Sequence, residues 1–163
     1  HFTKLPDPNV DKVVHVSSAD EMMFECDKAL PVNIAICAAA VADYKVMKQS
    51  ETKIKKNGSS LDITLEENPD ILSRLSKRND KRPDLVVGFA AETEKLEENS
   101  KIKLEKKGCD WILGNNVSNG QVIGKDTNEI HFISKSETEK WKQMRKEEVA
   151  EKLSHKIVQH LKS

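Results

Sequence analysis

The chain has 163 residues, with 27 basic and 27 acidic side chains, so its formal net charge is zero and it offers no global positive field for nucleic acid or an anionic membrane. A charged fraction of 33% and a mean hydropathy of -0.62 indicate a soluble protein. The longest apolar run, Ile34 to Ala42, is much shorter than the ~18 residues that a membrane span needs.

The amino-terminal part of the chain predicts a strand and then a helix. After a loop with two prolines, the valines of Val10 to Val16 predict the strand. Ser18 and Glu21 have the spacing of a capping box, in which each side chain binds a backbone N–H at the start of a helix. The helix ends at Pro31, and its apolar stripe consists of Met22, Cys26 and Leu30.

The stretch from Ile34 to Val41 is short, apolar and rich in small residues. This pattern is typical of a strand buried on both faces of a parallel sheet, and we place that strand at Asn33 to Ala40. Its alanines give the strand an end without bulk, where a flat ligand could lie on the backbone. Ligands of open α/β sheets bind outside the carboxyl ends of the strands, and Asp43 is expected to stand at that edge.

A polar loop is expected from Asp43 to Ser60. Its lysine cluster (Lys53, Lys55 and Lys56) is a solvated charge run if residue types alone are considered. Leu61 to Leu65 alternates apolar and polar residues and predicts a half-exposed strand. Asn68 predicts the N-cap of a helix, with Pro69 at its first position.

The second half of the chain alternates strands and helices. Gly88 allows a close approach, and Phe89 is interpreted as a core residue. Lys103 and Lys107 share a helix face near a C-terminus that Gly108 closes. The expected strands are Asp84 to Ala90, Trp111 to Asn115 and Glu129 to Ile133, and the expected helices are Thr93 to Lys107 and Lys146 to Leu161.

This alternation predicts one α/β domain, a Rossmann-like three-layer sandwich with a mainly parallel sheet. The usual first strand and its glycine-rich loop are missing from the sequence, so we expect the domain, residues 1 to 163, to be amino-terminally incomplete. No G-x-G-x-x-G fingerprint occurs, and GQVIGK at Gly120 to Lys125 is one residue short of a P-loop. Three cysteines without metal-ligand spacing predict reduced thiols in a cytoplasmic protein and no metal site on the chain.

Five segments in order resemble one known family. They are AAAVADY with the later KIKK, then NPDIL, VGFAAETE, KKGCDWILGNNVS and TNEIHFI. The chain resembles the phosphopantothenoylcysteine synthetase domain of the bifunctional coenzyme A biosynthesis flavoprotein over essentially its whole length. Each segment alone is a modest signal, but the five together are specific.

The resemblance implies a ligase of coenzyme A biosynthesis. CTP activates the carboxylate of 4'-phosphopantothenate as an acyl-cytidylate, pyrophosphate leaves, and the amine of cysteine then attacks to form an amide. Such chemistry depends on the positioning of the substrates and on cations that offset the negative charge of the phosphates, usually with Mg²⁺. The FMN of the bifunctional family belongs to the decarboxylase half, which is absent here.

Carried over by motif, the resemblance assigns Lys53 to catalysis and to the nucleotide phosphates. The other nucleotide-binding positions that it implies are Cys37, Ala38, Ala39, Asp43, Pro69, Asp70, Ile71, Leu72, Phe89, Lys103 and Lys107. It also implies a homodimer with small-molecule substrates and without nucleic acid or a membrane as partner. Because the family's amino-terminal phosphate loop is absent, we expect little activity from these 163 residues alone.

Two other functions stay open from the sequence. The chain could be a nucleotide- or flavin-binding module without turnover, using the same strand-end cleft. It could also be a Rossmann-like oxidoreductase, which the absent fingerprint disfavours.

Overall fold

The computed structural model describes residues 6–48, 50, 52–56, 58, 60–117 and 127–162. The chain divides into two compact units: His1–Leu30 with Val41–Asp70, and Pro31–Ala40 with Ile71–Ser163. Within the described ranges, no helix combines the length and the apolar character that crossing a membrane demands.

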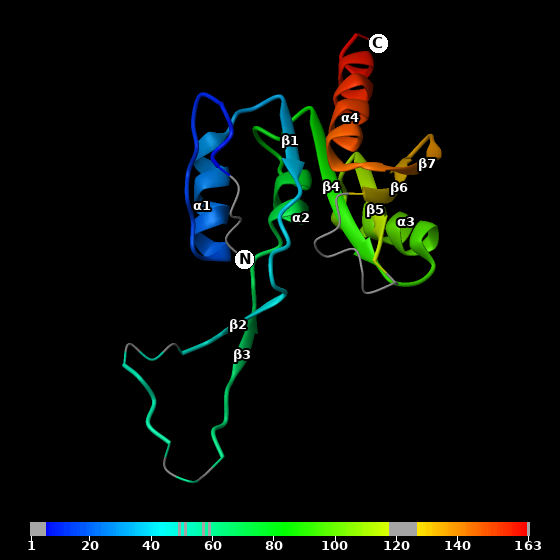
Figure 1. The fold of residues 1–163 in the computed structure, drawn as a ribbon. Helices are drawn as coiled ribbons and strands as arrows, with labels where there is room; N and C mark the ends of the chain where they lie inside the picture. Colours follow the sequence, from blue (N-terminus) through cyan, green and yellow to red (C-terminus); the bar gives the residue numbers. More distant parts are fainter. Residues whose placement is uncertain are drawn as a thin grey trace. The chain divides into compact units, whose positions relative to one another are not determined.

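The first unit contains helix α1 (Ala19–Ala29) and a two-stranded antiparallel hairpin, β2 (Tyr44–Val46) with β3 (Leu65–Glu67) (Figure 1). The predicted N-cap is confirmed, because the Glu21 backbone N–H donates to Ser18 Oγ over 3.1 Å. The other half of the capping box differs: the Glu21 carboxylate accepts from the backbone N–H and the hydroxyl of Ser17. The helix ends before Pro31, as predicted.

Two strand predictions in this unit are wrong. Val10 to Val16 has no regular structure, and Val10, Val13 and Val14 are 58%, 40% and 43% exposed. A valine-rich segment forms a strand only where a ladder partner and a covering layer exist, and no described strand pairs with this segment. The strand predicted at Leu61 to Leu65 instead begins at Leu65, and β2 lies in the expected loop. Backbone hydrogen bonds from Met47 to Thr64 and from Asn68 to Asp43 close this hairpin.

The second unit is built on a five-stranded sheet in the order β1-β4-β5-β6-β7 (Figure 1). Its strands are β1 (Ile34–Cys37), β4 (Leu85–Glu92), β5 (Trp111–Asn116), β6 (Thr127–Ser134) and β7 (Thr138–Arg145). Strands β1, β4 and β5 are parallel, whereas β6 and β7 continue the sheet in antiparallel order. The sheet is therefore mixed, because β6 runs antiparallel to β5 and the unpredicted β7 forms a hairpin with β6.

Strand β1 is shorter and more exposed than its sequence predicts. It covers four residues rather than Asn33 to Ala40, and Ile36 is 49% exposed. Among the described strands it pairs only with β4, so it is an edge of the sheet. Its residues are half-buried or exposed, so it is not buried on both faces as predicted.

Helices cover both faces of the sheet. On one face, Val149, Leu153 and Ile157 of α4 (Lys146–His160) pack against the odd-numbered side chains of β4 and β5. On the other face, α2 (Ile71–Ser76) and α3 (Leu96–Lys107) contribute Leu72 and Leu104 to a second cluster. The predicted three-layer α/β sandwich is confirmed, as are the two long helices and the end of α3 at Gly108, where φ is 72°.

The start of β4 and β5 is pinned by Asp110. Both its carboxylate oxygens lie 3.0 Å from Nη2 of Arg82, and Oδ2 also accepts from the Val86 backbone N–H over 2.7 Å. A charged acceptor shared in this way makes stronger hydrogen bonds than a neutral one. This interaction holds the loops before the two central strands against each other.

Gly114 of β5 lets α3 approach the sheet closely. A Cβ at this position would lie 2.3 Å from Ser100 Oγ and 3.0 Å from Leu96 Cδ1. Ser100 is fully buried, and its hydroxyl has no hydrogen-bond partner among the described residues.

We expect Gly114→Ala to destabilise the protein by about 1–3 kcal/mol, because the added methyl group overpacks the α3–β5 contact. Urea unfolding measures this loss. Ser100→Ala alone should cost little, since it removes an unpaired buried hydroxyl, and the double variant should recover part of the loss. A double variant no more stable than Gly114→Ala would contradict the assigned contact.

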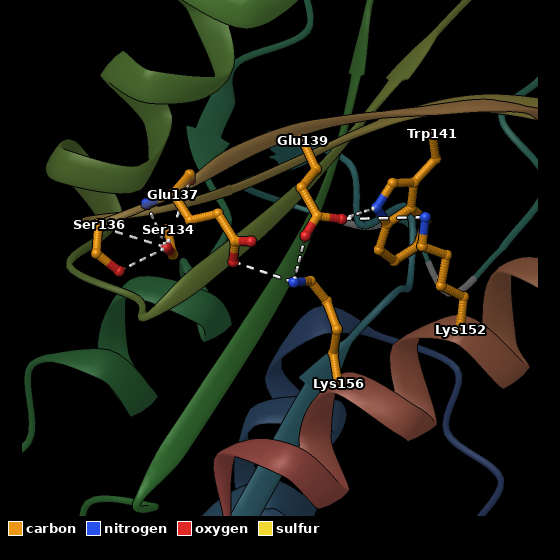
Figure 2. A network of polar contacts seen from close by, with 7 residues as sticks. All are labelled: Ser134, Ser136, Glu137, Glu139, Trp141, Lys152 and Lys156. Carbon is orange, nitrogen blue, oxygen red and sulfur yellow. Dashed lines mark hydrogen bonds and ion pairs between the residues drawn. The ribbon is translucent and has the colours of Figure 1, made fainter. Parts of the chain in front are cut away.

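A polar network joins α4 to the outer strand β7 (Figure 2). Lys156 Nζ donates to Glu139 Oε1 over 2.7 Å and to Glu137 Oε2 over 3.0 Å, and the Trp141 indole N–H donates to Glu139 Oε2 over 2.8 Å. Hydrogen bonds with Glu137 and Lys156 lower the pKa of Glu139 to about 2. Burial alone would lower the pKa of Lys156, but its hydrogen bonds to Glu139 and Glu137 outweigh this effect and raise it.

The depressed pKa of Glu139 predicts acid sensitivity. The stabilisation by its carboxylate is complete above the unfolded-state pKa of 4.5 and is lost as the pH falls toward about 2. Unfolding free energies measured between pH 5 and pH 2 should therefore fall less steeply for Glu139→Gln than for the wild type, by no more than about 1.4 kcal/mol per pH unit. Glu151→Gln, on the exposed side of α4, is the control and should keep the wild-type slope.

Candidate functional site

The carboxyl ends of the parallel strands form the candidate site of the second unit. Cys37 ends β1 and pairs with Gly88 of β4, while Glu92 and Asn116 end β4 and β5 as a pair. Ala38 and Ala39 follow β1 without regular structure and are exposed. Their backbone groups are therefore accessible at an edge where ligands of α/β sheets bind.

Gly88 and Phe89 serve the core at this edge. A Cβ on Gly88 would lie 2.5 Å from Leu72 Cδ2, so this glycine makes room for α2 and not for a ligand. Phe89 is half-buried and packs against the cluster under α4, in agreement with its interpretation as a core residue. The sequence correctly predicted a close approach at Gly88, but it did not identify Leu72 as the side chain that approaches.

Lys103 and Lys107 lie on α3, where the sequence predicted them. Lys103 Nζ lies 2.6 Å from Oε1 of Glu92, a contact that the sequence analysis missed. The feature of the sequence that could have indicated this contact is Glu92 itself, a carboxylate at the end of an apolar strand. Lys107 is in the last turn of the helix, where a positive charge interacts favourably with the helix dipole.

The remaining predicted residues belong to the first unit or to the start of α2. Asp43 and Lys53 are exposed, and the Asp43 carbonyl accepts from the Asn68 backbone N–H over 2.8 Å. The prediction that Asn68 caps the next helix is wrong: α2 begins at Ile71, and Asn68 Nδ2 donates to the Ala42 carbonyl over 2.9 Å. The Asn68 side chain thus links the end of β3 to Ala42, which precedes β2.

The predicted site residues therefore fall into two groups. Cys37, Ala38, Ala39, Ile71, Leu72, Phe89, Lys103 and Lys107 belong to the second unit, and Asp43, Lys53, Pro69 and Asp70 belong to the first. Ile71 is buried and Leu72 half-buried, which makes their side chains part of the α2 packing. Among the predicted residues of the second unit, Ala38 and Ala39 are exposed, and Cys37, Lys103 and Lys107 are half-buried.

The family model of the DNA/pantothenate metabolism flavoprotein C-terminal domain matches residues 2–161. The chain belongs to this family. A coenzyme A biosynthesis bifunctional protein CoaBC of Haemophilus influenzae is 38% identical over 151 residues, which cover 93% of this chain and 38% of that protein. A cysteine/cysteine sulfinic acid decarboxylase from an unknown prokaryotic organism is also 38% identical, over 149 residues that cover 90% of this chain and 41% of the relative.

The family's fold is also found in a solved structure. The crystal structure of the C-terminal domain of coenzyme A biosynthesis bifunctional protein CoaBC matches 99% of this chain and 71% of that chain, with a TM-score of 0.78 and 29% identity. This likeness agrees with the α/β sandwich of the second unit. The chain spans about two fifths of the length of the two curated relatives described above.

Proposed function

We propose that this chain is the ligase part of a coenzyme A biosynthesis enzyme, which joins 4'-phosphopantothenate to cysteine with CTP. The observation that carries the proposal is the match of nearly the whole chain to the C-terminal domain family of CoaBC-type proteins. The open strand end at Cys37, Ala38 and Ala39 supports it, because a nucleotide needs an unobstructed backbone edge.

In this proposal the substrate carboxylate is the nucleophile. One carboxylate oxygen attacks the α-phosphorus of CTP, the bond to the β-phosphate bridging oxygen breaks, and pyrophosphate leaves with the electron pair. The cysteine amine then attacks the acyl carbon, loses a proton, and displaces CMP. The chain therefore contributes positioning and electrostatic stabilisation and needs no nucleophilic side chain.

Lys53 is the side chain that we assign to the phosphates. A lysine is a compact point charge on a flexible stem, and Lys53 is exposed in a segment without regular structure. Asp43, Pro69, Asp70, Ile71, Leu72, Phe89 and Lys107 remain proposed members of the nucleotide site, together with the strand-end residues and Lys103.

Mg²⁺ belongs to the proposal as the companion of the triphosphate. Among the described residues, no three His, Cys, Asp or Glu side chains gather into a metal-binding group. Mg²⁺ commonly keeps several waters and binds through substrate phosphates, which fits a site of this kind. FMN would belong to another part of a bifunctional protein, and the homodimer and cytoplasmic location stay predictions.

The natural full-length protein should release pyrophosphate when it is mixed with CTP, phosphopantothenate and cysteine. We expect CTP to be used in preference to ATP, so equal turnover with both nucleotides would count against that choice. Absence of pyrophosphate combined with flavin absorbance would favour a binding module instead. NAD(P)H binding without ligation would favour an oxidoreductase.

Lys53→Ala in the full-length protein tests the assigned cation. Formation of the acyl-cytidylate in a single turnover should slow by about 10²–10³, by analogy with the loss of one electrostatic donor. Stability should change by less than about 0.5 kcal/mol, because the side chain is exposed, and Lys53→Arg should rescue the rate only in part. Lys12→Ala, another exposed lysine, is the control; an unchanged rate in Lys53→Ala would remove the catalytic role.

A further inference from the structure

One residue of the first unit binds two consecutive carbonyl groups of the chain. Asn68 directly follows β3, and its backbone N–H donates to the Asp43 carbonyl over 2.8 Å. Its side-chain Nδ2 donates over 2.9 Å to the carbonyl of Ala42, the residue before Asp43. Because a carbonyl oxygen can only accept, the amide nitrogen of Asn68 and not its amide oxygen must face Ala42. The orientation of the Asn68 side chain is therefore fixed by its partner.

These two carbonyl groups lie on either side of the Asp43 Cα atom. The Ala42 carbonyl belongs to the planar peptide group before that atom, and the Asp43 carbonyl belongs to the planar group after it. Holding both planes restricts the φ and ψ angles of Asp43, and these angles set the direction of its Cα–Cβ bond. Only the side-chain torsions of Asp43 then remain free to place its carboxylate.

The chain around Asp43 is not held by buried side chains. Residues 38–44 are all exposed, and the β2–β3 ladder begins only at Tyr44. An exposed segment of this kind opens easily unless hydrogen bonds hold its backbone. The two bonds from Asn68, which is itself half-buried, are therefore the restraint that directs the Asp43 side chain.

We propose that Asn68 is a positioning residue for the nucleotide, and that it acts through Asp43. The inference rests on the proposed CTP-dependent function, in which Asp43 contacts the nucleotide. A carboxylate whose backbone is already held loses less conformational entropy on binding than one on a mobile backbone. Asn68 makes no contact with the nucleotide in this proposal, and it raises the affinity by preorganising the residue that does.

The other end of the Asn68 amide separates this role from a purely structural one. Its Oδ1 atom is buried and has no hydrogen-bond partner among the described residues. A buried acceptor without a partner costs stability, and this cost offsets the gain from the Nδ2 bond. We therefore expect Asn68→Ala to change the urea unfolding midpoint little, whereas it should weaken nucleotide binding clearly.

The test is a double-mutant cycle on the natural full-length protein. Dissociation constants for CTP with Mg²⁺, without phosphopantothenate, are measured by calorimetry for the wild type, Asn68→Ala, Asp43→Ala and the double variant. Asp43→Ala should weaken binding about 10–100-fold, as for a lost hydrogen bond to a charged group, and Asn68→Ala about tenfold. In the Asp43→Ala background, Asn68→Ala should change the constant by less than about twofold. Losses that add in the double variant would overturn the proposal, and so would an unchanged constant in Asn68→Ala.

Two further variants separate the donor from the shape of the side chain. Asn68→Asp keeps the shape but places a carboxylate oxygen against the Ala42 carbonyl, so it should weaken CTP binding at least as much as Asn68→Ala. The matched control is Asn33→Ala, because Asn33 Nδ2 also donates over 2.9 Å, to Oδ2 of Asp84, and these residues directly precede β1 and β4. Asn33→Ala should keep the wild-type constant. Wild-type affinity in Asn68→Asp, or an equal loss in Asn33→Ala, would contradict the assigned role.

Reciprocity supplies a measurement on the wild type. If the held backbone of Asp43 favours CTP binding, then CTP must favour the held backbone by the same factor. Hydrogen exchange of the Asn68 backbone N–H should therefore slow when CTP is added, and an unchanged exchange rate would contradict the proposal. If the wild type neither binds CTP nor releases pyrophosphate from it, the proposed function fails and this inference fails with it. If CTP is turned over but the losses in the cycle add, only the inference fails.

Discussion

The second unit depends on one constraint, the alternation of side chains along the central strand β4. Leu85 and Val87 point into the core under α4, whereas Val86 and Ala90 point into the core under α2 and α3. Leu85, Val86 and Val87 are completely buried, and burying a side chain of this size contributes roughly 1.5–3 kcal/mol. A shift of one residue in the register of β4 would exchange the two cores, which is why the Asp110 contact at its start matters for the whole sheet.

The same strand connects packing to the candidate site. Its buried beginning fixes its direction, and its last residue, Glu92, emerges at the edge where α3 passes. Gly88 and Gly114 let Leu72 of α2 and Ser100 of α3 pack closely against the sheet. Close packing in the middle of the sheet thus sets the geometry of charged groups at its end.

The sequence predicted those parts of the fold that local pattern determines. The burial of β4 and β5, the stripe of Val149, Leu153 and Ile157, and the glycine end of α3 all follow from periodicity or cap chemistry. Prediction from the sequence failed where strand pairing determines the structure. Val10 to Val16 has the composition of a strand, but no described strand pairs with it. Strand β7 was missed because it has one fully buried side chain, Trp141, among mostly polar residues. The helical composition correctly predicted that Lys103 lies on a helix. Its ion pair with Glu92 joins positions eleven residues apart in different elements, which no local pattern contains.

The exposed edge of β1 has a consequence for mobility. Among the described strands β1 is hydrogen-bonded to β4 alone, whereas β4 is hydrogen-bonded to a strand on each side. Local opening of such a strand breaks fewer hydrogen bonds and uncovers less apolar surface than opening of β4. Hydrogen exchange should therefore be fastest, among the parallel strands, in the one that leads to Cys37, Ala38 and Ala39. The proposed platform for the nucleotide thus directly follows the strand of the parallel set that we expect to open most easily, next to the fully buried residues of β4.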